Sequence, residues 1–196
     1  MTDDIILCGV GGQGTILASK LLSAAAMGRG LPVKTAETIG MAQRGGSVFS
    51  HVRIGDGAAS PLIGKGRAGL IIAFEPAEAV RQLPYLRPGG TVVVSNRPII
   101  PVSATIGGPA YDLPAIMDYL REQVENLVVV DADQAAADLG SAKCLNVVLL
   151  GAAVRSGALS LTADDLRKAI VDRLPERFHE LNFRALDQTT RTEVSV

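Results

Sequence analysis

Short apolar runs alternate with segments of helical periodicity through the first part of this 196-residue chain. Residues 4–10 are an apolar run that ends in glycines, a pattern typical of a buried strand. Apolar positions recur at helical spacing from Thr15 to Met27, and glycines at 28 and 30 end the predicted helix. A second strand is expected at residues 33–37, after Pro32. This order predicts two parallel strands joined by a right-handed crossover.

The next segment interrupts this alternation. IGMAQRGGS, residues 39–47, has no apolar period and predicts a loop. SVFSHVRI, residues 47–54, predicts one extended strand, and ASPLI, residues 59–63, a second short extended piece. Asp56-Gly57 between them favours a tight turn, so we expect a hairpin at an edge of the sheet.

Alternation of strands and helices resumes after this segment. Buried strands are expected at residues 69–75, 91–96 and 126–132, and helices at residues 76–86, 113–120, 133–139 and 142–155. Two further helices are expected, one after the Thr162/Asp165 capping box and one that begins at Pro175. Residues 97–112 predict a structured loop, and the tail from Thr192 a loose end. The whole chain, 1–196, is therefore expected to form one α/β domain: three layers, α/β/α, Rossmann-like, with a mostly parallel but mixed sheet and an edge hairpin.

Composition excludes several classes of protein. The formal net charge is -1 with scattered cations, which argues against nucleic acid or a membrane surface as partner. The two cysteines are far apart in sequence, so neither a zinc site nor an iron–sulfur cluster on this chain is expected. Asp3 and Asp4 stand where a signal peptide would be basic, and the apolar runs are too short to span a bilayer. A cytoplasmic location is expected.

The first candidate site is the turn CGVGGQG. Gly9, Gly11 and Gly14 spell G-x-G-x-x-G, and Glu37 stands near the distance at which a carboxylate holds a ribose in dinucleotide enzymes. Gly12 and Gln13 are unusual fillers for that fingerprint. Free amides at the start of the helix favour an anion or another acceptor. Three interpretations stay open: nicotinamide binding, a structural turn, and a phosphate-type or inter-subunit contact.

The second candidate site is GMAQRGGSVFSHVR, residues 40–53. Arg44 lies among glycines, where its guanidinium could clamp a carboxylate or phosphate, or instead brace the loop. His51 is more typical of a structural histidine than of a catalyst, and no metal-ligand spacing, G-x-S-x-G or Walker A motif is present. Both glycine-rich loops follow strands, so we expect them to converge on one crevice at the carboxyl edge of the sheet.

Gly55-Asp56-Gly57 resembles the start of a thiamine diphosphate signature. The asparagine that would complete such a magnesium site is missing at the required spacing, because Asn96 is too distant. We therefore interpret this stretch as a turn.

The combination of GVGGQGTILASKLL with ETIGMAQRGGSVFSHVRIG resembles the gamma domain of the 2-oxoacid:ferredoxin oxidoreductases, most closely the small (beta) subunit of the indolepyruvate type. LIIAFEPAEAVRQLPYLRPGG, LNVVLLGAAVRSG and LPERFHELNFRAL are also similar to family segments. The resemblance implies a subunit, inactive alone, of a hetero-oligomer that oxidatively decarboxylates a 2-oxoacid with coenzyme A and ferredoxin. It also implies that thiamine diphosphate, Mg and [4Fe-4S] clusters lie on the large (alpha) subunit.

The resemblance marks two groups of site residues without assigning a catalytic role: Gly9, Gly11, Gly12, Gln13 and Gly14, then Glu37, Gly40, Gln43, Arg44, Gly45, Gly46, Ser47, Ser50 and His51. Ile39 departs from the histidine or tyrosine expected in many relatives, which leaves open aryl or branched 2-oxoacids other than indolepyruvate. The alternatives are a stand-alone nucleotide-binding dehydrogenase and a non-catalytic ligand-binding or assembly module that forms homodimers.

Overall fold

A computed structural model describes residues 2–37, 45–57, 59–101, 110–189 and 193–194. A seven-stranded mixed sheet forms the middle layer, in the order β2-β3-β1-β4-β5-β6-β7. The strands are β1 (Asp3–Val10), β2 (Val33–Glu37), β3 (Ser47–Ile54), β4 (Ala68–Ala73), β5 (Leu86–Ser95), β6 (Asn126–Val130) and β7 (Glu193–Val194). Strands β1, β4, β5 and β6 are parallel, whereas β3 and β7 run antiparallel to their neighbours.

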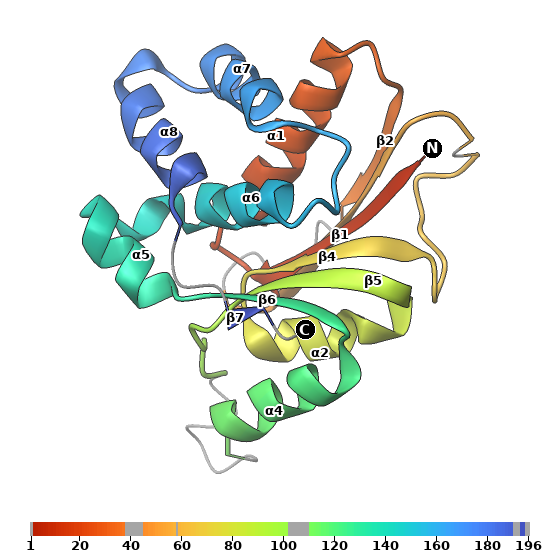
Figure 1. Cartoon of the computed structure of the whole chain (residues 1–196), viewed down its shortest axis with the longest axis vertical. Coiled ribbons are helices and arrows are strands. Elements are labelled where there is room, and N and C mark those ends of the chain that lie inside the picture. Colours follow the sequence, from red (N-terminus) through yellow and green to blue (C-terminus); the bar gives the residue numbers. More distant parts are fainter. Residues whose placement is uncertain (1, 38–44, 58, 102–109, 190–192, 195–196) are drawn as a thin grey trace.

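Helices cover both faces of the sheet (Figure 1). One face carries α1 (Thr15–Gly28), α5 (Ala132–Leu139), α6 (Leu145–Arg155), α7 (Ala163–Arg173) and α8 (His179–Asp187), and the other carries α2 (Pro76–Gln82) and α4 (Leu113–Gln123). The expected three-layer α/β/α class is confirmed. Among the described residues, no helix is both long and apolar enough to cross a bilayer.

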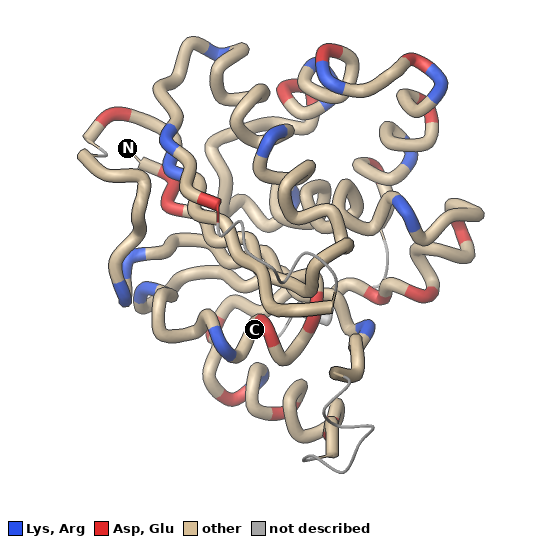
Figure 2. The backbone as a smooth tube through the Cα atoms, turned by 180° about the vertical axis from the view of Figure 1, so that it is seen from behind, with Lys and Arg blue, Asp and Glu red and all other residues tan. Residues whose placement is uncertain are grey.

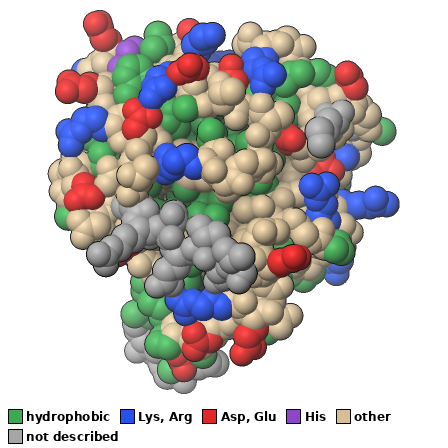
Figure 3. Space-filling view, viewed as in Figure 1, with side chains coloured by type: hydrophobic (Ala, Val, Ile, Leu, Met, Phe, Trp, Pro, Cys, Tyr) green, Lys and Arg blue, Asp and Glu red, His purple; other side chains and the backbone are tan. Residues whose placement is uncertain are grey.

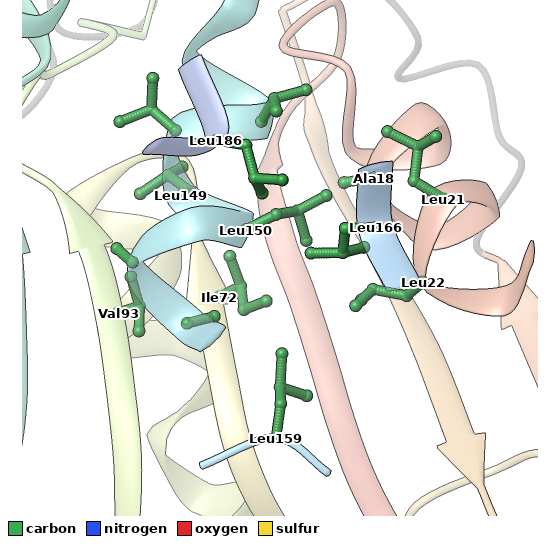
Figure 4. Close-up of a cluster of buried hydrophobic side chains, with 14 of the residues drawn as sticks. Ala18, Leu21, Leu22, Ile72, Val93, Leu149, Leu150, Leu159, Leu166 and Leu186 are labelled. Atoms are coloured by element: carbon green, nitrogen blue, oxygen red, sulfur yellow. The ribbon is translucent and has the colours of Figure 1, made fainter. Parts of the chain in front are cut away.

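Side-chain alternation along the strands produces two separate cores. On β1, Ile5 and Leu7 face the α1/α6 side, while Ile6 and Cys8 face α2 and α4. The larger core is centred on α6, whose leucines pack over Ile72 and Val93 of the sheet (Figure 4). Each such leucine contributes about 2 kcal/mol of transfer free energy.

Close contact between α6 and α8 depends on a glycine within α6. A Cβ added at Gly151 would lie 2.1 Å from the carbonyl oxygen of Leu186, closer than any real contact allows. The Thr162 side chain accepts from the Asp165 N–H at 3.3 Å, and the Asp165 carboxylate accepts from the Thr162 N–H at 2.9 Å. This confirms the capping box expected at the start of α7.

The edge hairpin exists, but its two arms are not the ones expected. It consists of β2 and β3, whereas residues 59–63 form no strand. Strand β3 pairs with β1 through eight residue pairs on its other side, so it is an inner strand with no free edge for a further arm. Ile63 instead packs under the sheet, in the α2/α4 core. The prediction of a loose tail is also wrong for residues 193–194, which pair with β6.

Candidate functional site

The glycine turn joins the carboxyl end of β1 to the start of α1. Gly14, the residue before the helix, has φ +85°, which strains any side-chain-bearing residue, and a Cβ there would lie 2.9 Å from Nδ2 of Asn146. A Cβ at Gly9 would lie 2.7 Å from Oε1 of Gln13 and 2.8 Å from Cβ of Phe74. Close packing inside the chain therefore accounts for these two glycines without any ligand.

Gln13 uses both ends of its amide within the chain. Its Oε1 accepts from the Val10 N–H at 2.7 Å, and its Nε2 donates to the Phe74 carbonyl at 2.8 Å. Val10 ends β1 and Phe74 directly follows β4, so the side chain ties the ends of two neighbouring parallel strands. Gln13 is thus a positioning residue that fixes the shape of the turn.

The second glycine loop is hydrogen-bonded to the first. The Gly11 N–H donates to the Gly46 carbonyl at 2.9 Å, and the Gly45 N–H donates to the Gly11 carbonyl at 3.4 Å. The loops meet because Val10 at the end of β1 pairs with Ser47 at the start of antiparallel β3. The sequence suggested that β1 and β2, the strands that precede the two loops, are neighbours in the sheet. They are not, because β3 lies between them.

Glu37 is turned toward α1. Its Oε1 accepts from the Ser19 hydroxyl at 2.7 Å, and Ser19 is buried. In a dinucleotide fold the strand with the ribose carboxylate lies next to the first strand. Here it lies two strand spacings away, about 10 Å. This arrangement does not favour Glu37 as a ribose ligand.

Two buried carboxylates below the loops were not predicted as site residues. The Ser47 hydroxyl donates to Oε2 of Glu78 at 2.5 Å, and Arg81 forms an ion pair with the same carboxylate. Glu75 caps α2 through the Glu78 N–H at 2.9 Å and accepts from the Tyr111 hydroxyl. The only sequence signal for them was their place, directly after a buried strand and in the first turn of a helix.

These carboxylates change the acidity of their neighbours. Burial raises the pKa of Cys8 well above its usual value, and the charges of Glu78 and Glu75 add to the effect. Burial also raises the pKa of Tyr111, and the hydrogen bond to Glu75 raises it further. Cys8 is therefore a protonated, unreactive thiol and Tyr111 a neutral hydrogen-bond donor.

His51 and Ser50 lie inside the sheet rather than in the loops. His51 is 5% exposed, and its Nδ1 accepts from the Ile63 N–H at 3.2 Å. Its ring packs edge-on against Phe49 and Tyr85. Burial, followed by the charge of Arg53, lowers the pKa of His51, so the ring is neutral near pH 7. These contacts are those of a structural histidine, and Ser50 is likewise buried.

Gly40, Gln43, Arg44 and Ile39 lie outside the described residues. Within the described ranges, no group of three or more His, Cys, Asp or Glu side chains could hold a metal ion. Cys8 and Cys144 are free and buried. Gly55 and Gly57 both have positive φ around exposed Asp56, as expected of a turn rather than a thiamine site.

The fold and site define a three-layer α/β domain whose nucleotide-type turn is closed by its own glutamine and bonded to a second glycine loop. The chain belongs to the pyruvate ferredoxin/flavodoxin oxidoreductase family, whose sequence profile matches residues 4–192. The indolepyruvate oxidoreductase subunit IorB of Archaeoglobus fulgidus is 41% identical over 93% of this chain and 91% of its own length. The subunit of the same name from Pyrococcus horikoshii is 36% identical over 94% and 92%.

Solved structures agree at the level of fold. The keto/oxoacid ferredoxin oxidoreductase gamma subunit of Geobacter sulfurreducens superposes with a TM-score of 0.68 at 23% identity, covering 95% of this chain and 93% of that one. A 2-oxoglutarate:ferredoxin oxidoreductase chain from Magnetococcus marinus gives 0.70 at 23% identity, and the match covers 30% of that longer chain. The resemblance stated from the sequence is confirmed, and with it the expected role of a subunit of an oxidoreductase in this family.

Proposed function

We propose that this chain is the small subunit of a 2-oxoacid:ferredoxin oxidoreductase that acts on indolepyruvate or a related aryl 2-oxoacid, with coenzyme A as co-substrate. In this proposal the edge formed by the two glycine loops faces the large subunit and helps to shape its substrate or coenzyme A site. The observation that supports this role of the edge is the pair of hydrogen bonds between Gly11 and residues 45–46, which joins both loops into one surface.

The side chains of this edge favour a surface role over chemistry. Both ends of the Gln13 amide are hydrogen-bonded inside the chain, Oε1 of Glu37 accepts from Ser19, and the Ser47 hydroxyl donates to Glu78. Among its described residues, the edge presents glycine backbone, which lets another molecule approach closely because glycine has no side chain. Gly12 and Gly45 are both exposed.

The cofactors of such a reaction do not fit this chain. Its two cysteines, both buried, cannot ligate a four-iron cluster, and the turn at Asp56 lacks the partner residue of a thiamine site. We therefore place thiamine diphosphate, Mg and [4Fe-4S] clusters on the large subunit, and the electron transfer to ferredoxin with them.

Reconstitution with the large subunit tests the proposal. The isolated chain should be colourless and inactive, whereas the co-expressed complex should reduce ferredoxin or a dye when indolepyruvate and coenzyme A are both added. A cluster spectrum on the isolated chain, or activity without the partner, would overturn it. Phenylpyruvate and a branched 2-oxoacid, assayed in parallel, identify the preferred acid.

Substitution in the second loop tests the role of the edge. Arg44→Ala should lower the activity of the complex much more than it lowers the melting temperature, because an arginine in a glycine-rich loop adds little to a core. Arg173→Ala, at the exposed end of α7, is the matched control and should change neither. A large loss of melting temperature with unchanged activity would make Arg44 a bracing residue instead.

The stand-alone dehydrogenase is the alternative that calorimetry can decide. It requires tight binding of a nicotinamide cofactor that is weakened by Glu37→Ala. The hydrogen bond from Ser19 to Glu37 argues against it. For the assembly-module alternative, the discriminating measurement is chromatography of the protein from its host, since a large iron–sulfur partner should co-purify only with an oxidoreductase subunit.

A further inference from the structure

A cavity of about 500 Å³ lies at the edge of the sheet opposite the glycine loops. It opens where β1, β4, β5 and β6 begin, and the turn after α6 closes one side; its lining includes Thr2, Asp3, Gly69, Arg87, Asn126 and Ser160. The length of β1, about 23 Å, separates this cavity from the glycine turn. Its volume is within the range of small-molecule sites. The cavity is therefore separate from the glycine loops, and its test does not depend on the proposed function.

Arg87, at the start of β5, is the distinctive side chain of the cavity. Its guanidinium lies against Gly69 of β4: a Cβ added there would be 3.5 Å from both Cζ and Nη2. Within the described ranges the guanidinium has no hydrogen-bond acceptor and no carboxylate partner. A glycine in a strand often marks a point of close approach, and here it gives the arginine room beside the backbone.

Four other polar side chains of the cavity lining, Thr2, Asp3, Asn126 and Ser160, are hydrogen-bonded within the protein. Asp3 accepts through Oδ2 from the Ser160 N–H at 2.9 Å and from its hydroxyl at 2.6 Å. The Asn126 amide donates to the Gly89 carbonyl at 3.2 Å, and the Thr2 hydroxyl to a carbonyl at 2.8 Å. The walls are thus fixed, and the fork of N–H donors on Arg87 remains available to a ligand.

The charged residues that line the cavity and the small pocket beside it are two arginines and two aspartates, and one of the aspartates is ion-paired with Arg53. Arg67 joins Arg87 in lining a small adjoining pocket and also lacks a partner among the described residues. Asp4 already accepts two hydrogen bonds from Arg53, of 2.7 and 3.1 Å. Of the two aspartates, Asp3 is therefore the one whose charge is not paired with Arg53. Lys and Arg positions gather where β4 and β5 begin (Figure 2), and cationic side chains are prominent at the right of the space-filling view (Figure 3).

We propose that this cavity binds a small hydroxylated oxyanion, a phosphate or carboxylate, through the guanidinium of Arg87. A planar guanidinium matches the two oxygens of such a group and binds them in bidentate fashion. Asp3 receives both of its hydrogen bonds on Oδ2, which leaves Oδ1 to accept from a ligand hydroxyl. The ligand class is set by this pairing of a free cationic donor with a fixed acceptor.

The test is a titration of the full-length chain, labelled with ¹⁵N, by inorganic phosphate and in parallel by malate, at constant ionic strength. We expect saturable shifts of the amide signals of Gly69, Gly89 and Gly157, which surround the cavity. Saturation by only one of the two anions identifies the headgroup. Shifts that stay linear, or that spread over the whole surface, would overturn the proposal.

Variants separate a site from general attraction to positive charge. Arg87→Ala should weaken binding by roughly tenfold or more, as expected for the loss of charge-assisted hydrogen bonds. Gly69→Leu should weaken binding by placing a side chain against the Arg87 guanidinium and taking up part of the cavity, while leaving every charge in place. Arg173→Ala is the control, an exposed arginine on α7 that should bind like wild type. Equal binding by the wild type and Arg87→Ala, or equal loss in Arg173→Ala, would refute the assignment.

Discussion

The internal hydrogen bonds of Gln13 predict that Gln13→Ala destabilises the fold rather than removing a ligand contact. The substitution leaves the Val10 N–H and the Phe74 carbonyl without partners, at positions that are 7% and 0% exposed. A buried group that loses its partner costs about 1 to 3 kcal/mol. Because water can reach one side of the half-buried turn, we expect a total loss of about 2 to 4 kcal/mol.

For a chain of this size, 1 kcal/mol lowers the melting temperature by about 2 to 4 °C. Thermal unfolding followed by circular dichroism should therefore place Gln13→Ala roughly 5 to 15 °C below wild type. Gln13→Met keeps most of the side-chain volume but neither bond, so it should lose a similar amount. Gln123→Ala, an exposed glutamine at the end of α4, is the control and should melt like wild type.

The reconstituted complex supplies the second measurement for this residue. If Gln13 only shapes the turn, the variant complex should keep the wild-type KM for the 2-oxoacid at temperatures where it is folded. An unchanged melting temperature together with a raised KM would refute the reasoning and make Gln13 a ligand contact.

Three further predictions follow from the packing and the acidities. Gly151→Ala should lower the melting temperature by several degrees, because its Cβ would lie 2.1 Å from the Leu186 carbonyl oxygen, whereas Gly28→Ala, with open space around it, should not. The pKa of His51 is lowered in the fold, so the unfolded chain binds the proton more readily. The free energy of unfolding should therefore fall as the pH drops below about 6.5, and this fall should be smaller in His51→Phe than in the wild type. Cys8, with a raised pKa and no exposure, should resist alkylation at pH 8 until urea unfolds the chain, and rapid labelling of the native protein would contradict its burial.

Local signals predicted most of the elements. The apolar runs that became β1, β4 and β6 are short and bounded by glycine or by capping residues, and both features favour buried strands over helix segments. The capping box at Thr162 was predictable because both partners lie within one helical turn. The same holds for the glycine turn, since the motif and the helix after it are contiguous in sequence.

The pairing of β3 was not predictable from the sequence. A strand that follows a turn signal can pair with the next segment or with an earlier one, and local pattern does not distinguish the two. The Asp56-Gly57 turn suggested that β3 pairs with the residues that follow the turn. Instead β3 lies between β2 and β1, where both of its edges are hydrogen-bonded. Because β3 lies between β2 and β1, Glu37 is farther from the glycine turn than a ribose-binding carboxylate would be. The G-x-G-x-x-G motif therefore does not indicate dinucleotide binding here.

The sequence by itself determined the α/β class, the two glycine loops and, through both loops together, the family of this protein. Only the tertiary structure decided what the side chains in those loops do. Gln13 reaches Phe74 in addition to nearby Val10, and the partners Phe74, Ser19 and Glu78 of Gln13, Glu37 and Ser47 lie 61, 18 and 31 residues away along the chain, on elements that meet only when the sheet is assembled. A hydrogen bond depends on distance in space, and spacing along the chain carries that information only for residues within the same turn or helix.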